Sequence, residues 1–217
     1  MPTKLPRKTT KRSYAGLSSE VRVTTRRLQF IEAGKKLFGT LGYHRTTVRL
    51  LCQEAELTDR YFYESFPSIE DLLVTIYELY ITELEQTIIQ ALVMDHSTPV
   101  EERIRLGLDA FFRRTEDPML SRVLWIEILG VSPGAEAVYN KSLRRFADLL
   151  FNLSKALLPD WPISDAVAKT ACMGVIGAAS ETAKSWLLAN YEQPRATLVE
   201  GMMLIFRGLV NLAQSSK

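Results

Sequence analysis

The sequence predicts an all-α protein of about nine helices. Apolar side chains recur at helical spacing over most of the 217 residues, and no stretch alternates polar and apolar residues as a half-buried strand does. Glycine occurs 11 times and proline 9 times, together fewer than is usual in a chain of this length. These observations favour long helices over a turn-rich β-architecture.

Composition narrows the class of protein. Hydrophobic residues make up 47% and charged residues 24% of the chain, which is typical of a globular protein. The two cysteines, Cys52 and Cys172, lack the spacing of a zinc site or a disulfide scaffold. No apolar run is long enough to span a bilayer, and no apolar segment follows the basic N-terminus as in a signal peptide. We therefore expect a soluble, cytoplasmic protein that needs no metal or other cofactor.

Charge is distributed unevenly along the chain. Residues 1–66 contain thirteen lysines and arginines and six acidic residues, which gives a net charge of +7. Residues 67–217 contain fourteen lysines and arginines and nineteen acidic residues, which gives a net charge of −5. A basic segment of this kind indicates a polyanionic partner at the N-terminal end. An unstructured, solubilising tail would give the same charge pattern and stays open on charge alone.

The first long helix is predicted to end near residue 41. Its apolar face, spaced as on an amphipathic helix, comprises Phe30, Ile31, Gly34, Leu37, Phe38 and Leu41. Gly42 then occupies the position of a left-handed C-terminal cap. Residues 1–18 are rich in Lys, Arg, Ser and Thr and show no such periodicity, so we expect a flexible basic arm there.

Recognisable start signals mark the later helices. Two short helices are predicted at Val48–Ala55 and Asp59–Ser65. Capping boxes begin at Ser68 and Thr98, and a proline follows a plausible cap at Asp117, Ser132 and Gln193. A proline-containing break at 159–162 precedes a helix at about 164–189, and the last helix is predicted at 194–213.

The segment 46–66 has the plan of a helix-turn-helix motif: a short helix, a three-residue turn and a second short helix. Thr58 is placed to cap the second helix, with Leu57 and Phe62 as a hydrophobic staple across its start. A helix this short is not stable alone, so one face must pack on its neighbours while the other is free to enter a major groove. A helical hairpin that is merely short remains the alternative.

Residues around this motif keep a characteristic order and spacing. They comprise Ala33-Gly34, Leu37-Phe38, Gly42-Tyr43, Thr46-Thr47-Val48, Leu51-Cys52, Ala55, Leu57-Thr58, the run Tyr61-Phe62-Tyr63-Glu64-Ser65-Phe66-Pro67-Ser68, and Glu70-Asp71-Leu72-Leu73. Over this ungapped stretch the chain resembles the tetracycline-repressor (TetR) family. The resemblance implies a homodimeric regulator, usually a repressor, that a small and mainly apolar effector releases from a palindromic operator in double-stranded DNA. It implies a helix-turn-helix DNA-binding domain at 19–67 and an effector-binding and dimerisation domain at 68–217.

Three residues depart from the family pattern. Glu56 stands where the turn usually has glycine, and a left-handed conformation there would cost of order 1 kcal/mol. Leu50 stands where an acidic residue usually completes a capping box with Thr47. Ile69 replaces a lysine that would contact a phosphate, so we expect Arg45, Arg49 and the basic arm to supply part of the backbone contacts.

The resemblance also implies roles in DNA binding. Thr46, Thr47 and Tyr63 would face phosphates, while Arg49, Thr58, Arg60 and Tyr61 would face base edges or the groove wall. Arg60 is the first candidate for sequence discrimination, because arginine matches guanine with a bidentate contact. For the two tyrosines, packing within the small domain is the alternative.

The effector candidates lie on the helices of the larger domain. They are Phe111, Phe112, Met119, Trp125, Glu127, Met173, Glu181 and Trp186. For the apolar residues, ordinary core packing is the alternative. Glu127 and Glu181 are acids on largely apolar helices, so each needs a partner or an exposed position, and an ion pair remains open for both.

Small residues on the last two helices suggest a dimer interface. Gly174, Gly177 and Ala178 would let another helix approach closely, as would Gly201 and Gly208 on the last helix. The resemblance implies an isologous four-helix bundle formed by these two helices from each subunit. Packing within one chain around the same glycines is the alternative.

Other classes of function fit less well. A di-iron bundle needs Glu-x-x-His pairs, but Leu41 and Val93 stand three residues before His44 and His96. No P-loop, Rossmann glycine pattern or nucleophile elbow occurs, so we expect no enzyme. We also expect no membrane partner, because no basic amphipathic helix accompanies the arm. A non-specific DNA-architectural protein without an effector remains the alternative function.

Overall fold

The computed structural model describes residues 13–93, 97–157 and 163–215, and over these residues the protein is all-α, as predicted. These described residues form nine α-helices, a 3-10 turn and a π-helical segment. They are α1 (Ser13–Thr40), η1 (Tyr43–Arg45), α2 (Val48–Ala55), α3 (Asp59–Ser65), α4 (Ile69–Val93), α5 (Val100–Thr115), α6 (Pro118–Arg122), the π-helical η2 (Val123–Glu127), α7 (Pro133–Leu157), α8 (Asp165–Leu188) and α9 (Arg195–Ser215).

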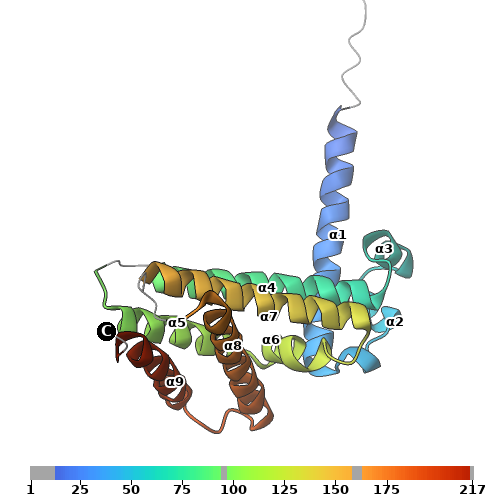
Figure 1. The fold of residues 1–217 in the computed structure, drawn as a ribbon. Helices are drawn as coiled ribbons and strands as arrows, with labels where there is room; N and C mark the ends of the chain where they lie inside the picture. The colour runs from blue at the N-terminus through green and yellow to red at the C-terminus, as the bar shows by residue number, and fades with distance from the viewer. Residues whose placement is uncertain (1–12, 94–96, 158–162, 216–217) are drawn as a thin grey trace, which may run out of the picture.

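The helices form a small N-terminal unit and a larger body (Figure 1). In the N-terminal unit, α2 and α3 pack on the C-terminal half of α1. In the body, α4 lies beside α5 and α7, while α8 packs on α7 and α9 packs on α5. The two parts meet where α1 contacts α4 and α6.

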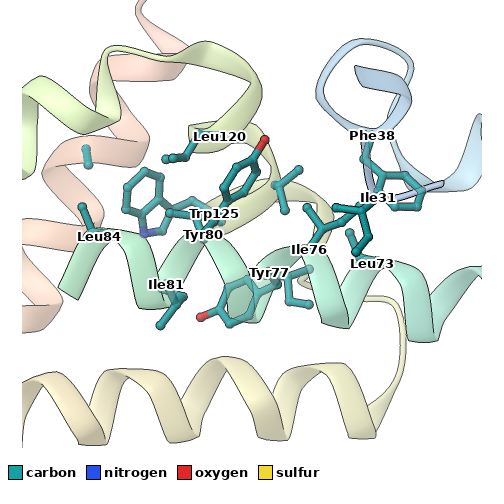
Figure 2. Close-up of a cluster of buried hydrophobic side chains, with 14 of the residues drawn as sticks. Ile31, Phe38, Leu73, Ile76, Tyr77, Tyr80, Ile81, Leu84, Leu120 and Trp125 are labelled. Carbon is teal, nitrogen blue, oxygen red and sulfur yellow. The ribbon is translucent and has the colours of Figure 1, made fainter. Parts of the chain in front are cut away.

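One contiguous cluster of buried apolar side chains extends through both parts (Figure 2). It begins with Phe30 and Phe62 between α1 and α3, whose ring centroids lie 5.3 Å apart in an edge-to-face arrangement. It continues through Ile76 of α4 to Trp125 and ends at Met203 of α9. The larger body therefore supports the helix-turn-helix through shared core packing.

Several of the predicted start signals make the expected hydrogen bonds. Asp117 accepts from the amides of Met119 and Leu120 at the start of α6, and Ser132 accepts from the amide of Ala135 at 3.1 Å. Ser68 accepts from the amide of Asp71 at 3.1 Å and donates to its carboxylate at 2.6 Å.

Three expectations about helix starts differ from the structure. Pro99, not Thr98, is the N-cap residue of α5, and no side chain caps it. Thr58 has the extended backbone of an N-cap residue, but its side chain forms no capping hydrogen bond. Helix α1 begins at Ser13, inside the predicted 1–18 arm, because a helix anchored at one end gains a hydrogen bond with each added residue. The rest of that arm, residues 1–12, lies outside the described residues.

Candidate nucleic-acid interface and ligand cavity

The turn between α2 and α3 is built as a helix-turn-helix requires. Thr47 caps α2 by accepting from the amide of Leu50 at 3.3 Å. Glu56 ends the helix in the left-handed conformation, with φ 55° and ψ 37°. The amide of Leu57 donates a hydrogen bond to the carbonyl of Cys52 at 3.0 Å, as at a typical helix C-terminus. Glu56 thus adopts the conformation expected of the glycine that it replaces, at a cost of order 1 kcal/mol.

Two arginines of α1 hold α3 in place, and the sequence analysis did not identify them. Arg27 donates to the carbonyl of Ser65 at 2.5 Å, and its guanidinium lies 4.0 Å from the centroid of the Phe66 ring. Arg26 stacks 3.9 Å from the centroid of Tyr61 and forms an ion pair with Glu64 at 3.5 Å. Only their position on the face of α1 next to α3 distinguishes them from solvent-facing arginines.

The outward face of the motif presents most of the predicted DNA-binding side chains. Arg45, Thr47, Arg49, Thr58, Arg60 and Tyr63 are exposed. The Arg60 side chain is 82% exposed and pairs with Glu64, Nε to Oε1, at 3.0 Å. An exposed pair of this kind contributes little to stability, so Arg60 can exchange it for a base edge.

Two predicted DNA-binding residues are placed differently. Thr46 is buried, and its hydroxyl donates to the carbonyl of Gly42 at 2.8 Å, so it shapes the turn before α2 instead of presenting an oxygen to DNA. Tyr61 is half-buried beneath Arg26, an arrangement that favours the packing alternative for this tyrosine.

Glu127 joins the body to the turn that precedes the motif. The residue is 8% exposed, and its carboxylate accepts from the backbone amide of Tyr43 at 2.5 Å and pairs with Arg122, Nε to Oε1, at 2.7 Å. Gly42 has φ 89°, and a Cβ built there would lie 2.9 Å from both carboxylate oxygens. The acid on a largely apolar helix therefore has its partners inside the protein.

The larger body contains a cavity of about 190 Å³. Its walls come from α4, α5, η2, α7 and α8, with Phe206 of α9 at one side. Burial raises the pKa of the Tyr77, Tyr139 and Cys172 side chains on these walls, so all three are neutral at neutral pH. The volume exceeds that of an engineered 150 Å³ cavity that holds benzene and is below the ~300 Å³ of a small drug site. It suits a narrow apolar group.

Two of the eight effector candidates line this cavity, Phe111 and Trp125. Phe112 is packed against Trp186 with ring centroids 6.2 Å apart, and Met119 packs against Gly39 of α1. Met173 is exposed on α8.

The remaining candidates have partners elsewhere in the protein. The Trp186 indole donates to the carbonyl of Gln193 at 2.8 Å. Glu181 pairs with Lys184 at 2.6 Å, and Glu127 forms the contacts described above. Helical periodicity located the buried faces but not the residues that border a void.

The small residues of α8 and α9 face outward. A Cβ built at Gly174, Gly177, Gly201 or Gly208 would meet no atom within 4 Å, so these glycines do not serve packing within the protomer. Large apolar side chains surround them: Leu204 is 66% exposed, and Met173 and Ile205 are also exposed. Ala178 is half-buried against the core.

Residues 30–76 match the family described as "Bacterial regulatory proteins, tetR family". These residues span the C-terminal part of α1, the whole helix-turn-helix and the start of α4. Residues 30–76 therefore form a TetR-family DNA-binding domain. The protein is therefore a DNA-binding transcriptional regulator, and a family of regulators agrees with the expectation that it is not an enzyme.

Solved TetR-like structures share the fold over most of the chain. The fatty acid degradation regulator FadR from Bacillus halodurans has 20% identity and a TM-score of 0.69, covering 83% of this chain and 93% of its own. FadR from Bacillus subtilis, solved in complex with stearoyl-CoA, has 18% identity and a TM-score of 0.65. The match covers 82% of this chain and 96% of the FadR chain. A tetR-family regulator from Streptomyces coelicolor has 17% identity and a TM-score of 0.71. The match covers 89% of this chain and 84% of the Streptomyces coelicolor chain.

The comparison of this TetR-family chain with curated proteins gave no match. Within the described residues, no helix is both long and apolar enough to cross a membrane.

Replacing Arg60 of this TetR-family regulator with alanine should weaken binding to its selected operator by about 1–3 kcal/mol and relax the base preference. Tyr63→Phe removes only a hydroxyl from a side chain that is 60% exposed, so it should weaken all DNA sites about equally. Binding to selected and random duplexes at one salt concentration measures both effects. An Arg60→Ala variant with the full preference of the wild type would contradict the assigned role.

Proposed function

We propose that this regulator is a ligand-responsive repressor, a homodimer that binds a palindromic operator and leaves it when a mainly apolar effector fills the cavity. The observation that supports this most directly is the apolar cavity of about 190 Å³ inside the larger body. A non-specific DNA-architectural protein would have no use for such a cavity, because a void in a close-packed core costs stability.

The proposed effector contains an alkyl or acyl chain. The wall is formed mainly by Leu, Ile, Val and aromatic side chains, which offer contact area but few hydrogen-bonding groups. A structural relative, FadR from Bacillus subtilis, was solved in complex with stearoyl-CoA, which supports a chain-like effector here.

The proposed dimer interface is a four-helix bundle of α8 and α9 from two protomers. The open glycines on both helices and the exposed Leu204 and Ile205 beside them support it. Close helix approach at glycine, flanked by apolar side chains, buries area without a steric clash. In this arrangement residues 19–67 read DNA while residues 68–217 bind the effector and dimerise.

Replacing Gly177 with leucine should weaken the dimer by about 1–3 kcal/mol, because the added side chain overpacks the helix contact. The protomer should fold normally, since no atom lies within 4 Å of a Cβ at this position. Ala137→Leu, at an exposed site on α7, is the matched control. Sedimentation at micromolar concentration measures the effect, and a well-folded Gly177→Leu variant that stays fully dimeric would argue against this interface.

Decanol, a narrow uncharged probe, should bind the wild-type protein, change the fluorescence of Trp125 in the cavity wall and weaken operator binding. Coupling between two sites is typically 1–3 kcal/mol, or about 5–150-fold, and linkage requires the operator to weaken decanol binding by the same factor. Ala179→Leu fills part of the cavity and should weaken decanol binding, whereas Ala137→Leu should not. The proposal fails if no alkyl compound both binds the protein and releases it from DNA.

A further inference from the structure

The cavity wall is uncharged except at one place. Among the described residues that line the cavity, Arg103 is the single charged one. It belongs to a face of α5 that otherwise offers Val100, Ile104, Gly107, Leu108 and Phe111 to the cavity, at helical spacing. A positive charge is therefore placed where the helix pattern would put another apolar residue.

The Arg103 guanidinium is oriented by a backbone carbonyl and pairs with no carboxylate of the described residues. Its Nε donates to the backbone carbonyl of Leu92 at 2.7 Å, which holds the group at the end of α4 remote from the helix-turn-helix. No carboxylate among the described residues forms an ion pair with it, whereas Arg105, two residues later, pairs with Glu102 and Glu200. A half-buried cation that has no counter-ion among the described residues is open to an anionic ligand, because a desolvated charge needs a partner.

Resting on the proposed function, we propose that Arg103 binds the anionic head group of an amphipathic effector whose alkyl chain fills the cavity. A carboxylate or a phosphate would supply a counter-ion to the guanidinium fork. The alkyl chain would run from Arg103 toward Phe111 and Trp125. Phe111 lies eight positions after Arg103 on α5, or about 12 Å along the helix. That distance is comparable to the extended length of decanoate.

The test compares decanoate, decyl phosphate and decanol by calorimetric titration of the full-length dimer. Arg103→Gln removes the charge, Arg103→Lys keeps it without the planar fork, and Arg144→Gln removes an exposed charge from α7 as a control. Charge-assisted hydrogen bonds of this kind should make Arg103→Gln bind both anions about ten- to hundredfold more weakly. Decanol binding should not change, Arg103→Lys should recover part of the loss, and Arg144→Gln should match the wild type.

Four results would overturn the role of Arg103. If Arg103→Gln weakens decanol as much as decanoate, the residue only supports the cavity. If the variant binds both anions as the wild type does, the head group lies elsewhere. If decanol binds and the anions do not, the effector is uncharged while the proposed function stands; if nothing binds, both proposals fail. A loss with only one of the two anions would identify the head group as carboxylate or phosphate.

Independent contacts join the cavity wall to the helix-turn-helix. Leu124 and Trp125 line the cavity, and two residues later Glu127 accepts from the Tyr43 amide. All three belong to the π-helical η2, so a displacement of the wall displaces the carboxylate. The turn that it holds leads directly into Thr46 and Thr47 at the start of α2.

We infer that Glu127 is the positioning residue through which a filled cavity acts on the DNA-binding unit, which again rests on the proposed function. An effector that moves Trp125 would strain or break the bond between Glu127 and the Tyr43 amide and release the turn before α2. Because Glu127 does not line the cavity, changing it should alter the coupling between the two sites and not the binding of the effector itself.

Glu127→Gln is the test, with Glu136→Gln at an exposed site of α7 as control. Decanol should bind Glu127→Gln and the wild type equally, but the factor by which decanol weakens operator binding should fall toward one. In the wild type, decanol should also speed hydrogen exchange of the Tyr43 amide. Glu127→Asp, which keeps the charge but shortens its reach, replaces Glu127→Gln if that variant does not fold.

A Glu127→Gln variant with the full coupling factor would overturn this role, as would an unchanged Tyr43 exchange rate in the wild type. Decanol that fails to bind the wild type would overturn the proposed function as well. Reduced decanol affinity in Glu127→Gln alone would make Glu127 a support of the cavity and not a link to DNA.

Discussion

The buried carboxylate of Glu127 constrains where the helix-turn-helix lies on the rest of the molecule. A carboxylate that is only 8% exposed needs hydrogen bonds to offset its desolvation, and it receives them from Arg122 and the Tyr43 amide. Gly42 is required beside it, because a Cβ there would lie 2.9 Å from both oxygens. The turn before α2 therefore has one well-defined position relative to η2.

The shared apolar core makes that position rigid. Ile31 and Phe38 of α1 belong to the same cluster as Trp125 (Figure 2). Met119 packs so closely on α1 that a Cβ built at Gly39 would lie 2.8 Å from the Cα of Met119. Protein interiors are packed as densely as organic crystals and transmit strain instead of absorbing it. A ligand larger than the empty cavity must therefore be accommodated by movement of helices, and α1 is among their immediate neighbours.

The sequence specified the DNA-binding unit better than the cavity. The limits of α2 and α3 follow from local signals, such as the Thr47 cap and the break after Ala55, so both were predicted at the residues where they occur. Phe111 and Phe112 have the same side chain, yet only Phe111 borders the void. That distinction depends on how five elements meet, which no local pattern encodes. Arg103 did leave a signal, a charge at an apolar position of α5, that spacing alone could have revealed.

The length of α4 relates these two parts of the molecule. Its 25 residues span about 37 Å, from packing against α1 at Leu72 and Ile76 to the cavity wall at Ile88 and Leu92. A dimer that reads a two-fold site must keep its recognition helices about 34 Å apart, one turn of DNA. A tilt of α4 small enough to leave its contacts intact would still shift its DNA-proximal end, and the shift is doubled across the dimer axis. In the proposed dimer, the fold would therefore need no large rearrangement for occupancy of the narrow cavity to cause loss of register with DNA.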